Sequence, residues 1–193
     1  MLKYVLILLV FSSQAQALTK SQVKILSMAY TEGKRIGYPE TIQAIIFLES
    51  SAGENKQNLN DPSYGVGHMK VATFKNLLKR HFNHSGFSDD EIPGVLKKND
   101  RFAIYLTCLY FKSSVNFFRK RYKTKVWSRS VLSYNCGVTG VHENGLSNDP
   151  NDYVRKINSI IKNVIRPLNK ELKGGEQCGS LKNTEYGYQN SHV

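Results

Sequence analysis

A carboxylic acid at position 49 interrupts an apolar helical stripe. Ile42, Ile45 and Ile46 recur at the spacing of one buried helix face, and the next position of that stripe is Glu49. An apolar setting and a place near a helix C-terminus both favour the neutral form of a carboxyl group. Such an acid can donate a proton near neutral pH and take one back. The pattern also fits a core glutamate paired with an arginine or lysine.

Four segments that contain or follow this acid form an ordered set of motifs. They are Ile45-Ile46-Phe47-Leu48-Glu49-Ser50-Ser51, Ser63-Tyr64-Gly65-Val66-Gly67-His68-Met69-Lys70-Val71, Ser133-Tyr134-Asn135-Cys136-Gly137 and Tyr153-Val154-Arg155-Lys156-Ile157. Together they resemble the soluble lytic transglycosylase catalytic domain, a lysozyme-like all-α family. That family has a helix ending in Glu-Ser, then Ser-x-x-x-Gly-Leu-Met-Gln, Ala-Tyr-Asn-x-Gly and Tyr-Val-x-Lys-Val. Each motif alone is weak, whereas four in order over residues 21–168 are a strong signal.

The resemblance implies a lysozyme-like helical domain with a glycan-binding cleft, over residues 18–172, and a peptidoglycan lytic transglycosylase. Glu49 would be the catalytic residue. It would protonate the β-1,4 glycosidic oxygen between N-acetylmuramic acid and N-acetylglucosamine. It would then accept the proton of the muramic C6 hydroxyl, which attacks its own anomeric carbon. The product is a 1,6-anhydro end, and no water is consumed.

The second motif would supply residues that orient the acid and the substrate. By the resemblance, Ser63 would hydrogen-bond to Glu49, and Met69 would line the floor of the cleft. Gly65 and Gly67 would let the backbone approach the sugar closely. Taken without the resemblance, the serine and the glycines are ordinary turn residues, and the methionine is a core residue.

The third and fourth motifs would complete the site. The resemblance implies that Tyr134 and Asn135 hold the sugar and its N-acetyl group, and that Tyr153 reaches Glu49 from the last helix. Without the resemblance, both tyrosines would be interpreted as packing aromatics.

Two residues depart from the family pattern. His68 stands where the family has leucine, and Lys70 stands where it has a glutamine that faces the sugar. A lysine near Glu49 would favour the ionised carboxylate and oppose acid catalysis. Alternatively, Lys70 faces solvent or an anionic group of the substrate.

Three other functions compete with the transglycosylase. A lysozyme-type hydrolase would need a second carboxylate, for which Glu54 and Asp61 are the candidates. A non-catalytic wall-binding protein would use the same cleft without chemistry. A cationic nucleic-acid binder fits the charge, but no recognisable nucleic-acid motif is present, so nucleic acid is not an expected partner.

The first 17 residues have the order of a secretory signal peptide: a basic start with Lys3, an apolar run, and a small polar stretch that ends in Ala15-Gln16-Ala17. We therefore expect an exported protein of the periplasm or cell envelope, soluble after cleavage before Leu18. Residues 173–193 are polar and predict a flexible tail.

Helical spacing predicts an all-α fold, because alternating strand patterns are scarce. Loops are expected over residues 59–69 and 83–94. The expected helices run from Thr19 or Ser21 to Gly37, from Pro39 to Gly53, over 73–81, from Asp100, from Ser128 to near Gly137, and from Asp149-Pro150 to Leu172.

The chain is strongly basic, with a formal net charge of +12. Such a charge draws an exported protein to anionic surfaces, which suits peptidoglycan glycan strands as the partner. Small exported members of the family open the wall for a secretion or conjugation apparatus or for a phage, so such an apparatus is a further candidate partner.

The cysteines and histidines do not predict a metal site. Cys108, Cys136 and Cys178 permit one disulfide and leave one thiol. Cys178 is expected to be the free thiol, because it lies in the polar tail. No cysteine–histidine spacing suggests zinc, and no carboxylate cluster has ligand spacing. Neither a metal nor an organic cofactor is expected.

Overall fold

The computed structural model describes residues 18–83, 86–144 and 152–176, and these are mostly helical. The proposed signal peptide, the Asp149-Pro150 cap and Cys178 lie outside the described residues. The elements are α1 (Lys20–Ile36), α2 (Pro39–Ser50), β1 (Gln57–Asn58), β2 (Ser63–Tyr64), α3 (Val71–Phe82), α4 (Ile92–Lys98), α5 (Asp100–Arg121), α6 (Val126–Asn144), α7 (Asp152–Ile160), the π-helical segment η1 (Ile161–Ile165) and α8 (Arg166–Glu176).

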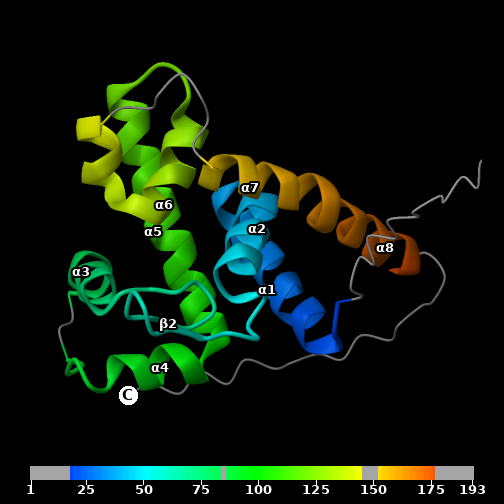
Figure 1. The fold of residues 1–193 in the computed structure, drawn as a ribbon, viewed down its shortest axis with the longest axis horizontal. Helices are drawn as coiled ribbons and strands as arrows, with labels where there is room; N and C mark the ends of the chain where they lie inside the picture. Colours follow the sequence, from blue (N-terminus) through cyan, green and yellow to red (C-terminus); the bar gives the residue numbers. More distant parts are fainter. Residues whose placement is uncertain (1–17, 84–85, 145–151, 177–193) are drawn as a thin grey trace, which may run out of the picture.

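Helices α1, α2, α3, α4 and α6 pack against α5, which runs between the α1–α2 pair and the α3–α4 side of the molecule (Figure 1). Helix α2 is enclosed by α1, α7 and η1, and α6 packs against α5 and α7. The all-α prediction is therefore confirmed for the described residues, apart from one two-stranded antiparallel ladder between β1 and β2. None of the described helices is both long and apolar enough to cross a membrane.

The ends of α1 and the start of α2 follow the predicted local signals. Thr19 forms a capping box with Gln22, and Gly37 ends α1 in the left-handed conformation. Pro39 occupies the first position of α2, where its missing N–H leaves no hydrogen bond unmade. This short connection folds α2 back against α1.

The core face of α2 is the predicted isoleucine stripe. Ile42, Ile45 and Ile46 are fully buried. Helix α2 ends at Ser50 rather than at Gly53, because residues 51–53 all adopt left-handed backbone conformations. A left-handed conformation costs a non-glycine residue roughly 1–2 kcal/mol, so neighbouring contacts must stabilise this turn.

Other boundaries differ from the prediction for identifiable reasons. The α5 cap is Asn99 rather than Asp100. The Asn99 side chain accepts the Phe102 N–H, and the Asp100 carboxylate lies 2.7 Å from the Lys56 ammonium. Helix α4 lies partly inside the predicted 83–94 loop. Its buried residues Ile92 and Leu96 are four apart and bind it to the core.

The C-terminal helix also differs from expectation. It contains the π-helical segment η1 and continues as α8 to Glu176, past the expected domain end at Leu172. The remainder of the proposed tail, residues 177–193, lies outside the described residues. Helix α6 begins at Val126, before the expected cap at Ser128, and kinks at Gly137, where the prediction ended it.

Alanine at Gly65 is expected to destabilise the protein more than alanine at Gly37. Both glycines have positive φ, 76° and 82°, so each alanine costs about 1–2 kcal/mol of backbone energy. A Cβ at Gly65 would also lie 2.7 Å from the Leu96 carbonyl oxygen, whereas nothing lies within 4 Å at Gly37. This overlap should lower the free energy of unfolding by a further ~1–3 kcal/mol. Urea denaturation of the two variants measures this difference. An equal decrease in the free energy of unfolding for both variants would contradict the prediction.

Candidate active site

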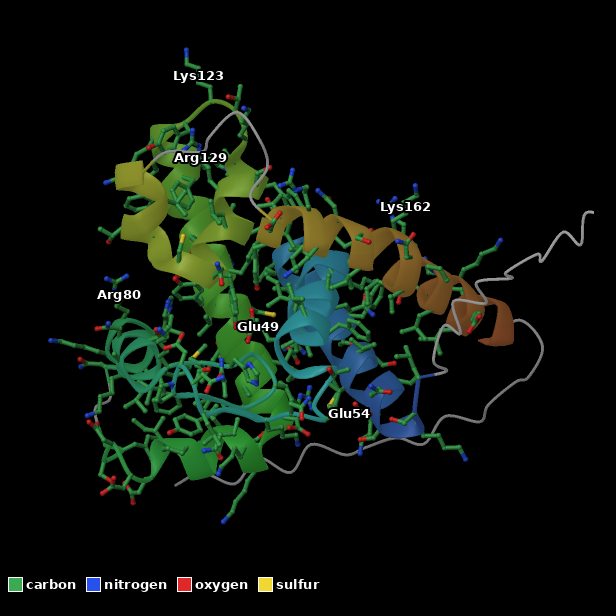
Figure 2. All side chains as sticks on the ribbon, in the orientation of Figure 1. Glu49, Glu54, Arg80, Lys123, Arg129 and Lys162 are labelled. Atoms are coloured by element: carbon green, nitrogen blue, oxygen red, sulfur yellow. The ribbon has the colours of Figure 1, made fainter. Side chains whose placement is uncertain are left out.

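Glu49 lies near the C-terminal end of α2 (Figure 2), and it lines a cavity of about 360 Å³. Its side chain is 19% exposed, so the carboxyl group is neither in the core nor free in solvent. The cavity walls come from β1 and the segment that follows it up to α3, from α3 and α5, and from the middle of α6. Of the predicted site residues, the cavity brings together Glu49, Ser63, Met69, Tyr134 and Asn135.

The two oxygens of Glu49 have different neighbours. The Tyr153 hydroxyl, from α7, donates a hydrogen bond of 2.5 Å to Oε1, which is the contact predicted for Tyr153. On the other side, Nδ1 of His68 lies 3.6 Å from Oε2. Burial, together with the charge of Glu49 and this hydrogen bond, raises the pKa of Tyr153. The phenol therefore remains a hydrogen-bond donor.

His68 is a site residue that the sequence analysis did not assign. Its imidazole Nε2 lies 2.7 Å from the Asn55 carbonyl oxygen, and its side chain is 11% exposed. Burial lowers the pKa of His68, but the nearby Glu49 carboxylate and the Asn55 carbonyl outweigh it, and the pKa is raised overall. The only sequence signal was that histidine replaces the leucine of the second motif.

The loop that carries His68 is held through its backbone carbonyl groups. Ser50 Oγ lies 2.7 Å from the Val66 oxygen and also accepts the Gly53 N–H. The Tyr134 hydroxyl donates to the Gly67 oxygen at 2.7 Å. Ser50 directly follows Glu49. Its hydroxyl therefore holds the turn at the end of α2 and the loop opposite the acid close to Glu49.

The close backbone approach at Gly67 is made within the protein. A Cβ at this position would lie 2.2 Å from Thr107 Oγ1 and 2.7 Å from the Tyr134 hydroxyl oxygen. Gly67 is itself buried. Its lack of a side chain is thus explained by the contact with α5 and α6.

The other predicted residues of the second and third motifs lie at the cavity with distinct surroundings. Met69 is buried and pairs with Tyr64 in a backbone bridge. Ser63 is also buried, but among the described residues its hydroxyl forms no hydrogen bond with Glu49. Asn135 is exposed at the cavity wall, so its amide is accessible to a ligand.

Lys70 is paired at the edge of the cavity. Its ammonium lies 2.8 Å from the Asp61 carboxylate, and both side chains are more than half exposed. The charge that would oppose acid catalysis is therefore engaged by Asp61 rather than by Glu49. The exposure of Lys70 agrees with the alternative that this side chain faces solvent, whereas binding of an anionic substrate group stays a prediction.

No protein-family model matches this chain, and a search of curated proteins found no similar sequence.

The cavity also holds a free thiol. Cys136 is exposed, whereas Cys108 is buried. Within the described ranges, no group of three or more His, Cys, Asp or Glu side chains could hold a metal ion. The chemistry available from these residues is proton transfer by Glu49 and His68, with phenol and amide groups to orient a ligand.

Phenylalanine at Tyr134 is expected to destabilise the loop that faces Glu49. The change removes the hydroxyl that donates to the buried Gly67 carbonyl, and an unpaired buried carbonyl costs about 1–3 kcal/mol. Tyr105→Phe is the matched control, because within the described part of the chain the Tyr105 hydroxyl makes no hydrogen bond. Thermal or urea unfolding compares them. If Tyr134→Phe lowers the free energy of unfolding no more than Tyr105→Phe does, the hydrogen bond from Tyr134 to Gly67 does not stabilise the loop.

Proposed function

We propose that this protein is a peptidoglycan lytic transglycosylase, which cleaves the MurNAc–GlcNAc β-1,4 bond without water and leaves 1,6-anhydro-MurNAc ends. The proposal combines the four ordered motifs with the surroundings of Glu49. An exported location in the periplasm or cell envelope belongs to it, as does a local wall-opening role beside a secretion, conjugation or phage apparatus.

The observation that carries the proposal is the difference between Glu49 and a structural glutamate in the same protein. Glu32 is 4% exposed and lies against two guanidinium groups, Arg35 at 2.9 Å and Arg101 at 3.4 Å. Glu49 has a tyrosine hydroxyl and a histidine instead, and no described lysine or arginine lies within ion-pair distance of it. A permanent cation would hold the carboxylate ionised, so its absence suits an acid that must gain and lose a proton.

The space around Glu49 suits an extended ligand. A second cavity, of about 400 Å³, adjoins the first, since Thr73 and Tyr110 line both. Ser113, Phe117 and Arg80 also line the second cavity, which mixes an aromatic face with polar groups. Sugar rings have both apolar faces and hydroxyl edges, so such a surface can accommodate consecutive residues of a glycan strand.

The proposed chemistry uses one carboxyl group twice. Glu49 gives its proton to the glycosidic oxygen as the C1–O bond breaks. The resulting carboxylate then takes the proton of the C6 hydroxyl while that oxygen bonds to C1. The proton count on Glu49 is restored, so no second carboxylate or water is required.

The hydrolase alternative has one supporting observation, because Asp61 lines the same cavity as Glu49. Its carboxylate is bound to Lys70, however, and is mostly exposed. Glu54, the other candidate, is exposed and lies apart from Glu49 (Figure 2). The non-catalytic alternative gives no reason for a proton-transfer pair in the cavity.

Glutamine at position 49 is expected to abolish release of muropeptides from purified sacculi. Loss of a general acid–base group lowers rates by roughly 10²–10⁴-fold. Mass spectrometry should find wild-type products lighter by one water than reducing-end sugars. Glu54→Gln is the matched control and should retain full activity.

Each other outcome overturns a part of the proposal. Reducing-end products, lost in Glu49→Gln and in Asp61→Asn, would make the protein a lysozyme-type hydrolase. Binding of wild-type protein to sacculi without product release would leave a wall-binding protein.

A further inference from the structure

The second proton-transfer group at the cavity has no part in the mechanism given above. His68 presents Nδ1 to Glu49 Oε2 at 3.6 Å. Its backbone is left-handed, with φ of 45°, and its N–H is bonded to the Gly65 carbonyl oxygen at 3.1 Å. A histidine in this conformation is held there by the loop, and the result is an imidazole directed at the acid.

The Asn55 carbonyl determines which imidazole nitrogen carries hydrogen. A carbonyl oxygen can only accept, so Nε2, at 2.7 Å, is its donor. In the neutral imidazole, Nδ1 is then left with its lone pair facing Glu49. A proton placed between the two residues therefore has an acceptor at each end, Nδ1 on one side and Oε2 on the other.

The surroundings isolate this pair from other charges. The Tyr153 hydroxyl is bonded to Oε1 of Glu49, and Lys70 is bonded to Asp61. Among the described residues, Glu49 is the one charged group found to act on His68. The other titratable groups at this site are Asp61, Lys70, Tyr110, Tyr134, Cys136 and Tyr153.

We propose that His68 is a positioning residue that shares a single proton with Glu49 and keeps that proton available for glycosidic cleavage. This inference rests on the proposed function. Before cleavage the pair holds one proton. The proton passes to the leaving oxygen as the C1–O bond breaks, leaving the carboxylate beside neutral His68. The proton released by the C6 hydroxyl, as its oxygen bonds to C1, restores the pair.

The pair gives the reaction a defined pH dependence. A single-proton pair exists between the first and the second deprotonation of the two residues together. The second step follows His68, whose pKa is raised. Activity should therefore persist above the range of an isolated carboxylic acid and be lost as pH rises through the raised pKa of His68.

Asparagine at position 68 tests this directly, because it keeps a polar group near Nδ1 but cannot carry the proton. We expect the falling alkaline limb of kcat/KM for sacculus digestion to move to lower pH by about one unit or more. The loss of activity should be smallest at acid pH and should grow as the pH rises. A uniform loss at every pH, with the limb unmoved, would show that His68 has only a structural role.

A titration without substrate separates this inference from the proposed function. Imidazole resonances of ¹⁵N-histidine-labelled protein are followed with pH in wild type and in Glu49→Gln. Removing the Glu49 carboxylate removes two of the effects that raise the pKa of His68, so its midpoint should fall. The exposed imidazole of His81 serves as the internal reference.

The combined outcomes are distinct. An unchanged His68 midpoint in Glu49→Gln, with anhydro products made by the wild type, would overturn the shared proton and leave the transglycosylase standing. A shifted midpoint without anhydro products would establish the pair but overturn the proposed function, and with it the role of the pair in cleavage.

Discussion

The placement of a single carboxyl group at the end of a buried helix constrains much of this structure. Helix α2 is apolar on its core face and enclosed by α1, α7 and η1, so its position is fixed by burial along its length. Because Glu49 belongs to α2, its backbone is held in the same fixed position. The rest of the site is then arranged around its two oxygens, with α7 contributing a hydroxyl to one and the loop before α3 presenting an imidazole to the other.

The loop opposite Glu49 has little regular secondary structure and depends on specific hydrogen bonds. Val66 and Gly67 offer their carbonyl oxygens to Ser50 and Tyr134, which belong to α2 and α6. These bonds connect the imidazole to the same helices that position the acid and the cavity wall. Buried polar groups satisfied in this way fix one conformation, because any alternative would leave carbonyl groups unpaired.

Sequence reasoning reached the parts of the structure that local physics determines. The capping box at Thr19, the left-handed Gly37 and the first-turn Pro39 depend on neighbours only a few residues away. The isoleucine stripe could also be predicted from the sequence, because the buried face of a helix repeats at a fixed spacing. Glu49 could be singled out as the residue that breaks this pattern.

The parts that were missed depend on contacts between distant segments. Helix α4, in which Ile92 and Leu96 are buried, packs against α3, α5 and β2, whereas its Pro93-Gly94 pair looks like a turn in the sequence. The orientation of the His68 imidazole depends on the backbone carbonyl of Asn55, thirteen residues earlier. Neither contact leaves a period or a spacing in the sequence, so only the folded structure brings these residues together.

The chain between Glu49 and His68 divides into parts with different tolerance to changes in length. Residues 51–53 form a left-handed turn fixed by Ser50, and β2 begins the tethered loop, so an insertion in either would displace the imidazole. Leu59 and Asn60, at the connection between β1 and β2, are exposed and pack against nothing in the core. Insertions between homologous proteins should accumulate at this connection, and it is also the place where a foreign peptide could be grafted without moving the acid or its partner.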